Sequence, residues 1–238
     1  TAGVVDTTAG TALNLDPLLI NLNFATVSSS GAAGAGIILD NVQGAGTGGS
    51  ALYIRTLTIT NSGQQGLFIT GGSTGLVTIG GGTITNSGGA SVQVGEAGVA
   101  GSGGTIGLSF GATITDGGAG PLVSILNIGG AIRFTGAISG AGPITIDGTA
   151  ARSSILFPVN GAVNGSTATA LSINNVAGTV GFTGTLTIAN PAGRGIVIGN
   201  SIAGSTVAFT GATTITGASA PALSLNNLAG STVFSGQL

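Results

Sequence analysis

The acidic side chains are the first candidates for chemistry in this chain, because paired carboxylates are what the hydrolysis of a glycosidic bond requires. In the repeat described below, Asp40, Glu96 and Asp147 fall near one corner but on windings that are not neighbours, so we expect them roughly 10 Å or more apart. The spacing therefore predicts solvated charges and no catalytic pair. The acidic residues are Asp6, Asp16, Asp40, Glu96, Asp116 and Asp147, and the basic ones, scattered singly, are Arg55, Arg133, Arg152 and Arg194.

The composition excludes several other kinds of site. Only 4% of the 238 residues are charged, and the chain contains no His, Cys, Met or Trp. Thiol chemistry, imidazole catalysis and His or Cys metal ligation are therefore impossible, and we expect a protein that is not an enzyme and needs no cofactor. A net charge of −2 without a basic run argues against nucleic acid as a partner. The apolar runs are far shorter than the roughly 20 residues of a spanning helix, so no membrane insertion is expected.

Internal repeats are the strongest pattern in the sequence. Short apolar-x-apolar triplets, each followed by Gly, Asn or Asp, recur along the whole chain, and such alternation predicts strands with one buried face. The first inward residues of these triplets span 210 residues in eight steps, about 26 residues per step. A period of this length, with Gly-rich corners and no helical pattern, indicates a solenoid. The residues are Leu13, Ile37, Leu67, Val92, Val123, Ile144, Leu171, Ile196 and Leu223.

Phenylalanine marks a second position of the same repeat. The chain has eight Phe residues, and six of them follow one another at intervals of 23 to 27 residues. Stacking each on its equivalent would bury a column of aromatic rings, where ring pairs contribute about 0.5 to 1.5 kcal/mol beyond the burial of area. Ile79 would continue this column one winding earlier. The predicted stack contains Phe110, Phe134, Phe157, Phe182, Phe209 and Phe234.

A third strand carries Thr-Ile-Thr or an equivalent triplet. Its middle residue is expected to point inward and its flanking residues to point to solvent. The outward threonines would form a ladder, which Ala137 with Ser139 and then Ala162 with Asn164 interrupt. The candidate ladder contains Thr58, Thr60, Thr83, Thr85, Thr113, Thr115, Thr185, Thr187, Thr214 and Thr216.

Asparagine marks a corner, two places after the last inward residue of the first strand. Asn tolerates left-handed backbone angles, and its amide can form a hydrogen bond with its own copy one winding away. The predicted corner ladder contains Asn41, Asn127, Asn175, Asn200 and Asn227.

Three strands and three corners per winding predict an all-β fold, a three-sided, right-handed parallel β-helix of about nine coils of about 26 residues. Each strand would lie on the strand one winding earlier at about 4.8 Å, which gives a rod roughly 40 Å long. We expect one domain, residues 1–238, that is a fragment or repeat block of a longer chain or fibre.

The Gly-, Ser/Thr- and Asn-rich, charge-poor repeat resembles the parallel β-helices of large secreted bacterial proteins, namely autotransporter passenger domains and filamentous haemagglutinin-like adhesins. The likeness covers nearly all 238 residues and rests on this pattern. It implies export, an extracellular or cell-surface location, and a non-catalytic structural or adhesive role as a scaffold or fibre subunit. The expected partners are further copies or neighbouring segments of the same protein, joined through the open ends of the solenoid, and a host surface or glycan.

Two alternative functions arise from the same residues. The outward Thr-x-Thr ladder resembles the ice-binding surfaces of antifreeze β-solenoids, where a rigid array of Thr methyl and hydroxyl groups orders water. Thr is also a favoured strand residue with no further purpose. The second alternative is a β-helix that binds or degrades polysaccharide, and the scattered carboxylates argue against it.

Overall fold

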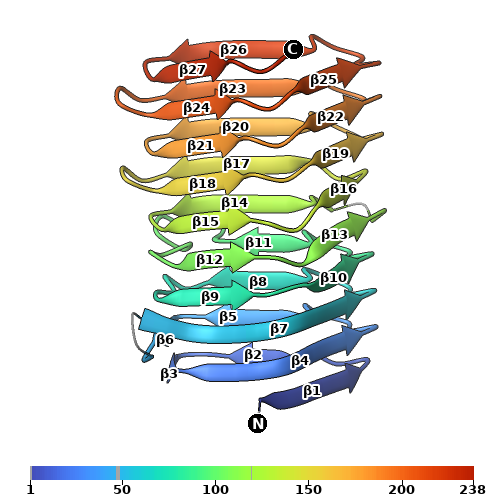
Figure 1. Ribbon diagram of the computed structural model, residues 1–238, viewed down its shortest axis with the longest axis vertical. Helices are drawn as coiled ribbons and strands as arrows, with labels where there is room; N and C mark the ends of the chain where they lie inside the picture. The colour runs from blue at the N-terminus through green and yellow to red at the C-terminus, as the bar shows by residue number, and fades with distance from the viewer. Residues whose placement is uncertain (1, 47–48, 119) are drawn as a thin grey trace.

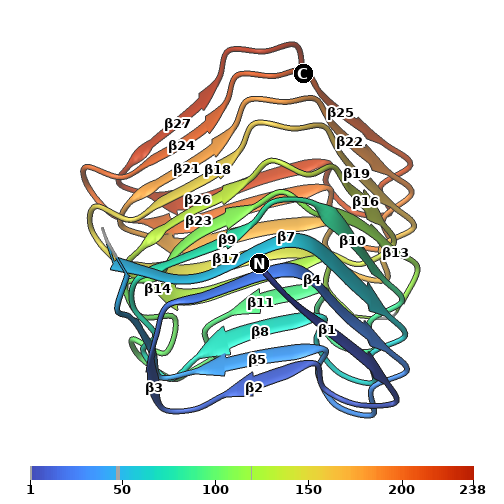
Figure 2. The same ribbon diagram turned by 60° about the horizontal axis from the view of Figure 1, so that its bottom comes forward.

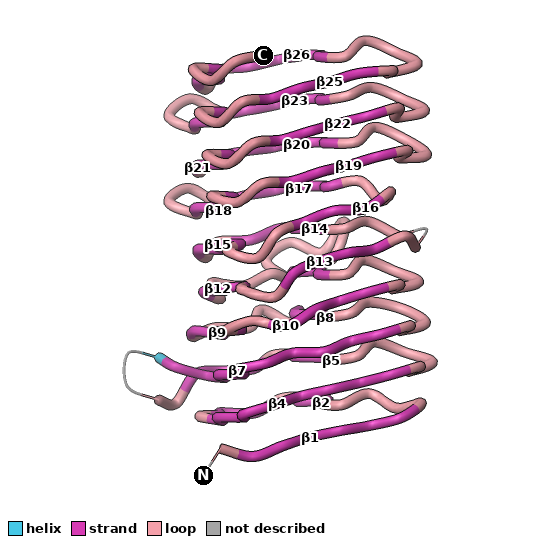
Figure 3. Tube along the Cα trace, turned by 45° about the vertical axis from the view of Figure 1, so that its right-hand side comes forward, coloured by secondary structure: helices cyan, strands magenta, loops and turns pink. Residues whose placement is uncertain are grey.

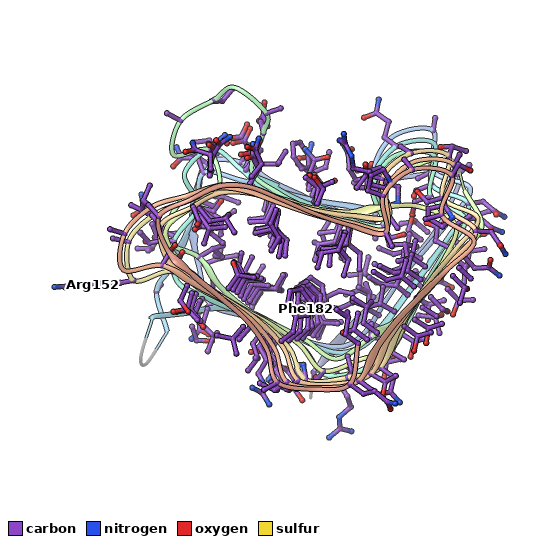
Figure 4. All side chains as sticks on the ribbon, turned by 90° about the horizontal axis from the view of Figure 1, so that it is seen from above. Arg152 and Phe182 are labelled. Atoms are coloured by element: carbon purple, nitrogen blue, oxygen red, sulfur yellow. The ribbon has the colours of Figure 1, made fainter. Side chains whose placement is uncertain are left out.

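The chain winds into a stack of parallel strands around one core. The computed structural model describes residues 2–46, 49–118 and 120–238. These residues form a three-sided β-solenoid of about nine turns without an α-helix (Figure 1). Seen from above, the chain passes the corner at Arg152 and returns along the face that carries Phe182 while it rises toward the viewer (Figure 4). The winding is therefore right-handed, as the sequence predicts.

The first face is a nine-stranded parallel sheet in which the equivalent strands of successive coils are neighbours. The nine inward residues predicted from the sequence pair with one another in register, from Leu13 with Ile37 to Ile196 with Leu223. The predicted repeat is thus confirmed. The strands are β2 (Leu13–Leu15), β5 (Ile37–Asp40), β8 (Leu67–Thr70), β11 (Val92–Val94), β14 (Val123–Ile128), β17 (Ile144–Thr149), β20 (Leu171–Val176), β23 (Ile196–Ser201) and β26 (Leu223–Leu228).

The second and third faces are two arms of one sheet. They join because the long strands β4 (Leu22–Ser30) and β7 (Ser50–Thr60) run around the corner between them (Figures 2 and 3). The second face continues through β9 (Leu76–Ile79), β12 (Gly107–Phe110), β15 (Ala131–Phe134), β18 (Ser154–Phe157), β21 (Thr179–Phe182), β24 (Thr206–Phe209) and β27 (Ser231–Phe234).

The third face begins with β1 (Gly3–Thr8), which pairs with β4. It continues through β10 (Gly82–Thr85), β13 (Thr113–Asp116), β16 (Ile138–Gly140), β19 (Gly161–Asn164), β22 (Leu186–Ala189) and β25 (Thr213–Thr216). A separate pair, β3 (Leu18–Ile20) and β6 (Val42–Gly44), extends the corner between the first two faces at the N-terminal end.

Backbone contacts make glycine necessary at the corner between the second and third faces. A Cβ atom at Gly211 would lie 2.1 Å from the carbonyl oxygen of Gly184, and one at Gly184 would lie 2.2 Å from the carbonyl oxygen of Val159. A side chain at either of these two positions would push its coil away from the one before it, because these distances are far below van der Waals contact. The high glycine content therefore serves close stacking of backbone on backbone.

Six phenylalanine rings form a column through the second face. The pairs from Phe134 to Phe234 are stacked, with ring centroids 4.6 to 4.9 Å apart, and Phe110 is tilted by 55° against Phe134 at 5.6 Å. The rings of Phe110, Phe134 and Phe209 are at most 1% exposed.

The column also extends toward the N-terminus. Ile79 pairs with Phe110, Ile54 with Ile79, and Phe24 with Ile54. Phe24 is therefore a seventh phenylalanine at this position, and sequence reasoning missed it because two isoleucines separate it from the others. One inward position is apolar in every coil.

Removing a ring from the middle of this column tests its energetic role. We expect Phe182→Ala to lower the free energy of unfolding by about 3 to 5 kcal/mol, because the change leaves a cavity between two stacked rings. The half-buried Phe68 points outward from β8, so Phe68→Ala should cost on the order of 1 kcal/mol. Denaturant unfolding of both variants gives the comparison, and equal losses would contradict a stacked core.

Candidate functional site

Seven of the nine strands of the first face lead into a corner whose residue, four places after the first inward residue, has a left-handed backbone. Gly71 and Gly148 take such angles, with φ of 64° and 74°. A residue with a Cβ atom loses about 1 to 2 kcal/mol in this conformation, and Asn tolerates it best. The predicted corner asparagines all have φ of 50° or 51°, namely Asn41, Asn127, Asn175, Asn200 and Asn227.

The side chains of these asparagines do not all form the hydrogen bonds with their own copies that the sequence predicts. Asn227 donates to its copy, Asn200, with an Nδ2 to Oδ1 distance of 2.8 Å. Asn200 instead donates to Asn174 at 2.9 Å, and Asn175 donates to Asp147 at 2.7 Å. The expectation of copy-to-copy bonding therefore needs correction. In these two cases the corner amide donates to the side chain of the residue just before the corner in the preceding coil. The acceptor there can be an amide oxygen, as in Asn174, or a carboxylate oxygen, as in Asp147.

A second asparagine corner, at the end of the third face, escaped the sequence analysis. Asn61, Asn86 and Asn190 have φ of 55°, 54° and 49°, and Asn86 Nδ2 donates to Asn61 Oδ1 at 3.1 Å. The signal was present in the repeated phrase Ile-Thr-Asn-Ser, which begins at Ile59 and again at Ile84. At both corners, the property that the asparagines share is thus the left-handed backbone angle.

The outward threonines of the third face form two straight columns over three coils. Thr58 pairs with Thr83 and Thr83 with Thr113, while Thr60 pairs with Thr85. Because Ile84 pairs with Ile114, Thr115 follows Thr85 in the second column. All six hydroxyl side chains are half-buried or exposed. This block of three coils, Thr58 to Thr115, is called the Thr face below.

Beyond the Thr face the register differs from the one that the sequence predicts. Ile138 pairs with Gly161, and the next inward position holds Val163, so Ala162 and not Asn164 follows Ser139. In the same way Thr214 pairs with Thr187. The predicted ladder positions of Thr214 and Thr216 therefore need correction, whereas Thr185 keeps its predicted column, because Leu186 pairs with Gly161. In this part of the face each strand has two inward positions, held by Leu186 and Ile188 in β22 and by Thr213 and Ile215 in β25. Thr214 therefore lies in the second outward column, and Thr216 lies beyond that column, two residues further along the strand.

Small side chains leave shallow depressions where the Thr face ends. One, of about 460 Å³, lies over β13, β16 and β19, and a second, of about 280 Å³, lies over β16, β19 and β22. They share Ser139 and Ala162. The flat part of the third face is therefore confined to the coils before β16.

The acidic residues do not gather into one site. Asp16 and Asp40 take equivalent positions in the first two coils, since Leu13 pairs with Ile37 and each carboxylate follows three residues later; the sequence analysis overlooked this pair. Burial, together with the charges of Asp16 and Glu96, raises the pKa of Asp40 above its ordinary value. Across the described residues, no group of three or more acidic, His or Cys side chains is placed to hold a metal ion.

Asp116 is a buried carboxylate with a structural role. It is 3% exposed, and it accepts hydrogen bonds from the backbone N–H of Ser87 and Gly118 and from the Ser91 hydroxyl. Its oxygens are therefore occupied by donors from its own coil and the coil before. Such a carboxylate joins two coils at a corner and is not presented to a substrate.

Comparison of the chain with known proteins does not assign it to a family. No family model matches the chain, and neither a curated protein nor a solved structure matches it. Within the part of the chain that the structure describes, no helix has the length and apolar character needed to cross a bilayer. The structure therefore establishes the architecture, a β-solenoid of about nine turns.

The raised pKa of Asp40 predicts a pH dependence of stability. The folded state holds this proton more tightly than the unfolded state, so the contribution of Asp40 to stability falls as the pH rises from the ordinary value of 3.8 through the raised pKa. We expect Asp40→Asn to raise the melting temperature at about pH 7 and to leave it unchanged at about pH 3.

A matched variant separates this effect from a general loss of charge. Asp147 has the equivalent position in a later coil, where it accepts the amide bond from Asn175. Asp147→Asn should therefore bring no gain at about pH 7. Thermal unfolding at both pH values gives the comparison, and a melting temperature of Asp40→Asn below that of the parent at about pH 7 would refute the predicted sign.

Proposed function

We propose that this chain is a non-catalytic structural and adhesive rod of the bacterial cell surface, serving as a scaffold segment or fibre subunit. The observation that supports the proposal most is the uninterrupted apolar column from Phe24 to Phe234, which every coil extends. A protein built in this way keeps the same cross-section along its length. Its repeat suits the tasks of spanning a distance and presenting side faces.

The chemistry of the surface supports an extracellular location. The outward positions carry mostly Thr, Ser, Asn and Gly, and only 4% of all residues are charged. Backbone ladders run along all three faces and leave few amide groups open, so we expect slow proteolysis, a useful property outside the cell. The pattern resembles autotransporter passengers and filamentous haemagglutinin-like adhesins, and this resemblance is what suggests export.

The last coil supports association with further coils. Leu225 is 49% exposed, whereas its partner one coil earlier, Ile198, is fully buried. Phe234, on the same coil, is only half-buried, whereas its partner Phe209 is 1% exposed. We propose that another β-coil, from the same protein or from a second copy, covers this surface and adds strands to β25, β26 and β27.

Immunogold electron microscopy on intact cells of the source organism tests this function. An antibody raised against the purified chain should label cells that have not been permeabilised, and the gold particles should lie in rows along thin fibres. Labelling that requires permeabilisation would overturn the surface location. Isolated particles on the surface would overturn the association of coils.

The Thr face supports ice binding as a second candidate function. Its two columns repeat the same hydroxyl and methyl groups over three coils in strict register. Neighbouring parallel strands lie about 4.8 Å apart, so the groups form a regular, rigid array. The register change after β13 limits this array to a small area, which makes ice binding the weaker candidate.

Growth of ice crystals in the presence of the chain tests the second candidate. We expect thermal hysteresis and faceted crystals for the parent chain, and their loss in Thr85→Tyr, because a large ring in the middle of the Thr face breaks its flatness. Thr214→Tyr, outside the Thr face, is the matched control and should keep the activity. A parent chain without hysteresis would dismiss ice binding.

A further inference from the structure

A hollow on the outer surface combines aromatic, amide and cationic groups. It has a volume of about 350 Å³ and lies near the N-terminal end. Its residues come from the part of the chain where β4 and β7 turn from the second face to the third, a bend that the ribbon of Figure 2 shows. A volume of this size falls within the range of pockets for small ligands. Its lining consists of Ala2, Asn23, Phe24, Ala25, Tyr53 and Arg55, and these residues are called the Tyr53 pocket below.

The strand register explains why Asn23 and Tyr53 lie side by side. They are direct partners in the parallel pair β4 and β7, so both side chains point outward about 4.8 Å apart. Ala2 precedes Gly3, the partner of Phe24, and presents only a methyl group below Asn23. Two polar side chains thus stand above a small one, and a hollow results.

The bend in β7 leaves Arg55 uncovered. Both Arg55 and Thr56 are exposed, while Ile54 and Leu57 are fully buried, so the strand turns between the two exposed residues. Ala25 lies below this bend. Above it, a Cβ atom at Gly80 would come within 2.9 Å of the Arg55 carbonyl oxygen. Because both neighbours are small, the guanidinium group remains accessible from outside.

The nearest acidic side chain in the strand register is already engaged. Asp6, on β1, pairs with Ser28, three positions beyond Ala25 along β4, and accepts a hydrogen bond from the Ser28 hydroxyl. Arg55 therefore gives the Tyr53 pocket a positive charge in a chain whose net charge is −2. A guanidinium group binds a carboxylate with two parallel hydrogen bonds.

We propose that the Tyr53 pocket binds the carboxylate-bearing sugar of an acidic saccharide. Arg55 holds the carboxylate, and the Asn23 amide offers a donor and an acceptor to neighbouring hydroxyl groups. The Tyr53 side chain is 37% exposed, and its ring offers an apolar wall for the C–H face of the sugar ring. A simple carboxylate would leave this wall and the amide unused.

The proposal deepens the adhesive part of the proposed function, because it names the class of ligand that the rod would hold. The proposed sugar binding and the proposed surface location can nevertheless be disproved independently of each other. A chain that labels the cell surface but does not bind the sugar overturns only the Tyr53 pocket. A chain that binds the sugar but stays inside the cell overturns only the surface role.

Nuclear magnetic resonance with labelled tyrosine tests the site, since Tyr53 is the single Tyr of the chain and gives one ring signal. We expect this signal to shift and saturate with methyl β-D-glucuronide. Methyl β-D-glucoside, which lacks only the carboxylate, should bind at least about tenfold more weakly, as the loss of a hydrogen-bonded charge implies. Equal binding of the two glycosides would overturn the role of Arg55, and equal binding of acetate and the glucuronide would overturn recognition of the sugar.

Two arginine variants complete the experiment. Arg55→Gln should lose at least about tenfold in affinity for the glucuronide. Arg133→Gln is the matched control, because Arg133 is exposed on the same face three coils further on and does not line the Tyr53 pocket. Both variants should melt at the temperature of the parent. Unchanged binding by Arg55→Gln, or an equal loss in Arg133→Gln, would contradict the proposal.

Discussion

Parallel pairing in register is the constraint on which the whole molecule depends. Each strand hydrogen-bonds to its equivalent one coil away, so the side chain at a given position always lies over the same position of the next coil. The backbone ladder alone contributes little net energy, because water competes for the same bonds. Stability comes from the continuous apolar columns, of which the stacked rings from Phe134 to Phe234 are the clearest.

The corners follow from the same constraint. Most corners of the first face repeat the same left-handed angle, and the strands after them return to register. This explains why Asn and Gly replace one another at the left-handed positions, as Asn127 and Gly148 do. Extra residues are tolerated at corners, since the 31-residue step between Val92 and Val123 leaves their pairing intact. The outward surface is free to vary, and it is there that the Thr face and the Tyr53 pocket arise.

The sequence predicts the core well and the surface poorly, for a physical reason. The first inward position of the first face and the position of the rings are apolar in every coil, so the nine first-face residues and the six rings are visible as a period. The third face misled the analysis at β19, because Ala162-Val163-Asn164 has the expected alternation although Val163 occupies a second inward position. Asn23 and Tyr53 lie 30 residues apart and no period connects their types. The Tyr53 pocket therefore required the bend of β7 and the strand register to become visible.

Contacts between phenylalanine rings measure the central claim most directly. In a chain with labelled Phe, nuclear Overhauser effects should join the ring of Phe182 to those of Phe157 and Phe209, whose centroids lie 4.6 and 4.9 Å away. Phe68 points outward on another face and should show no contact with any of them. A contact between Phe182 and Phe68, or the absence of contacts along the column, would contradict the stacked architecture.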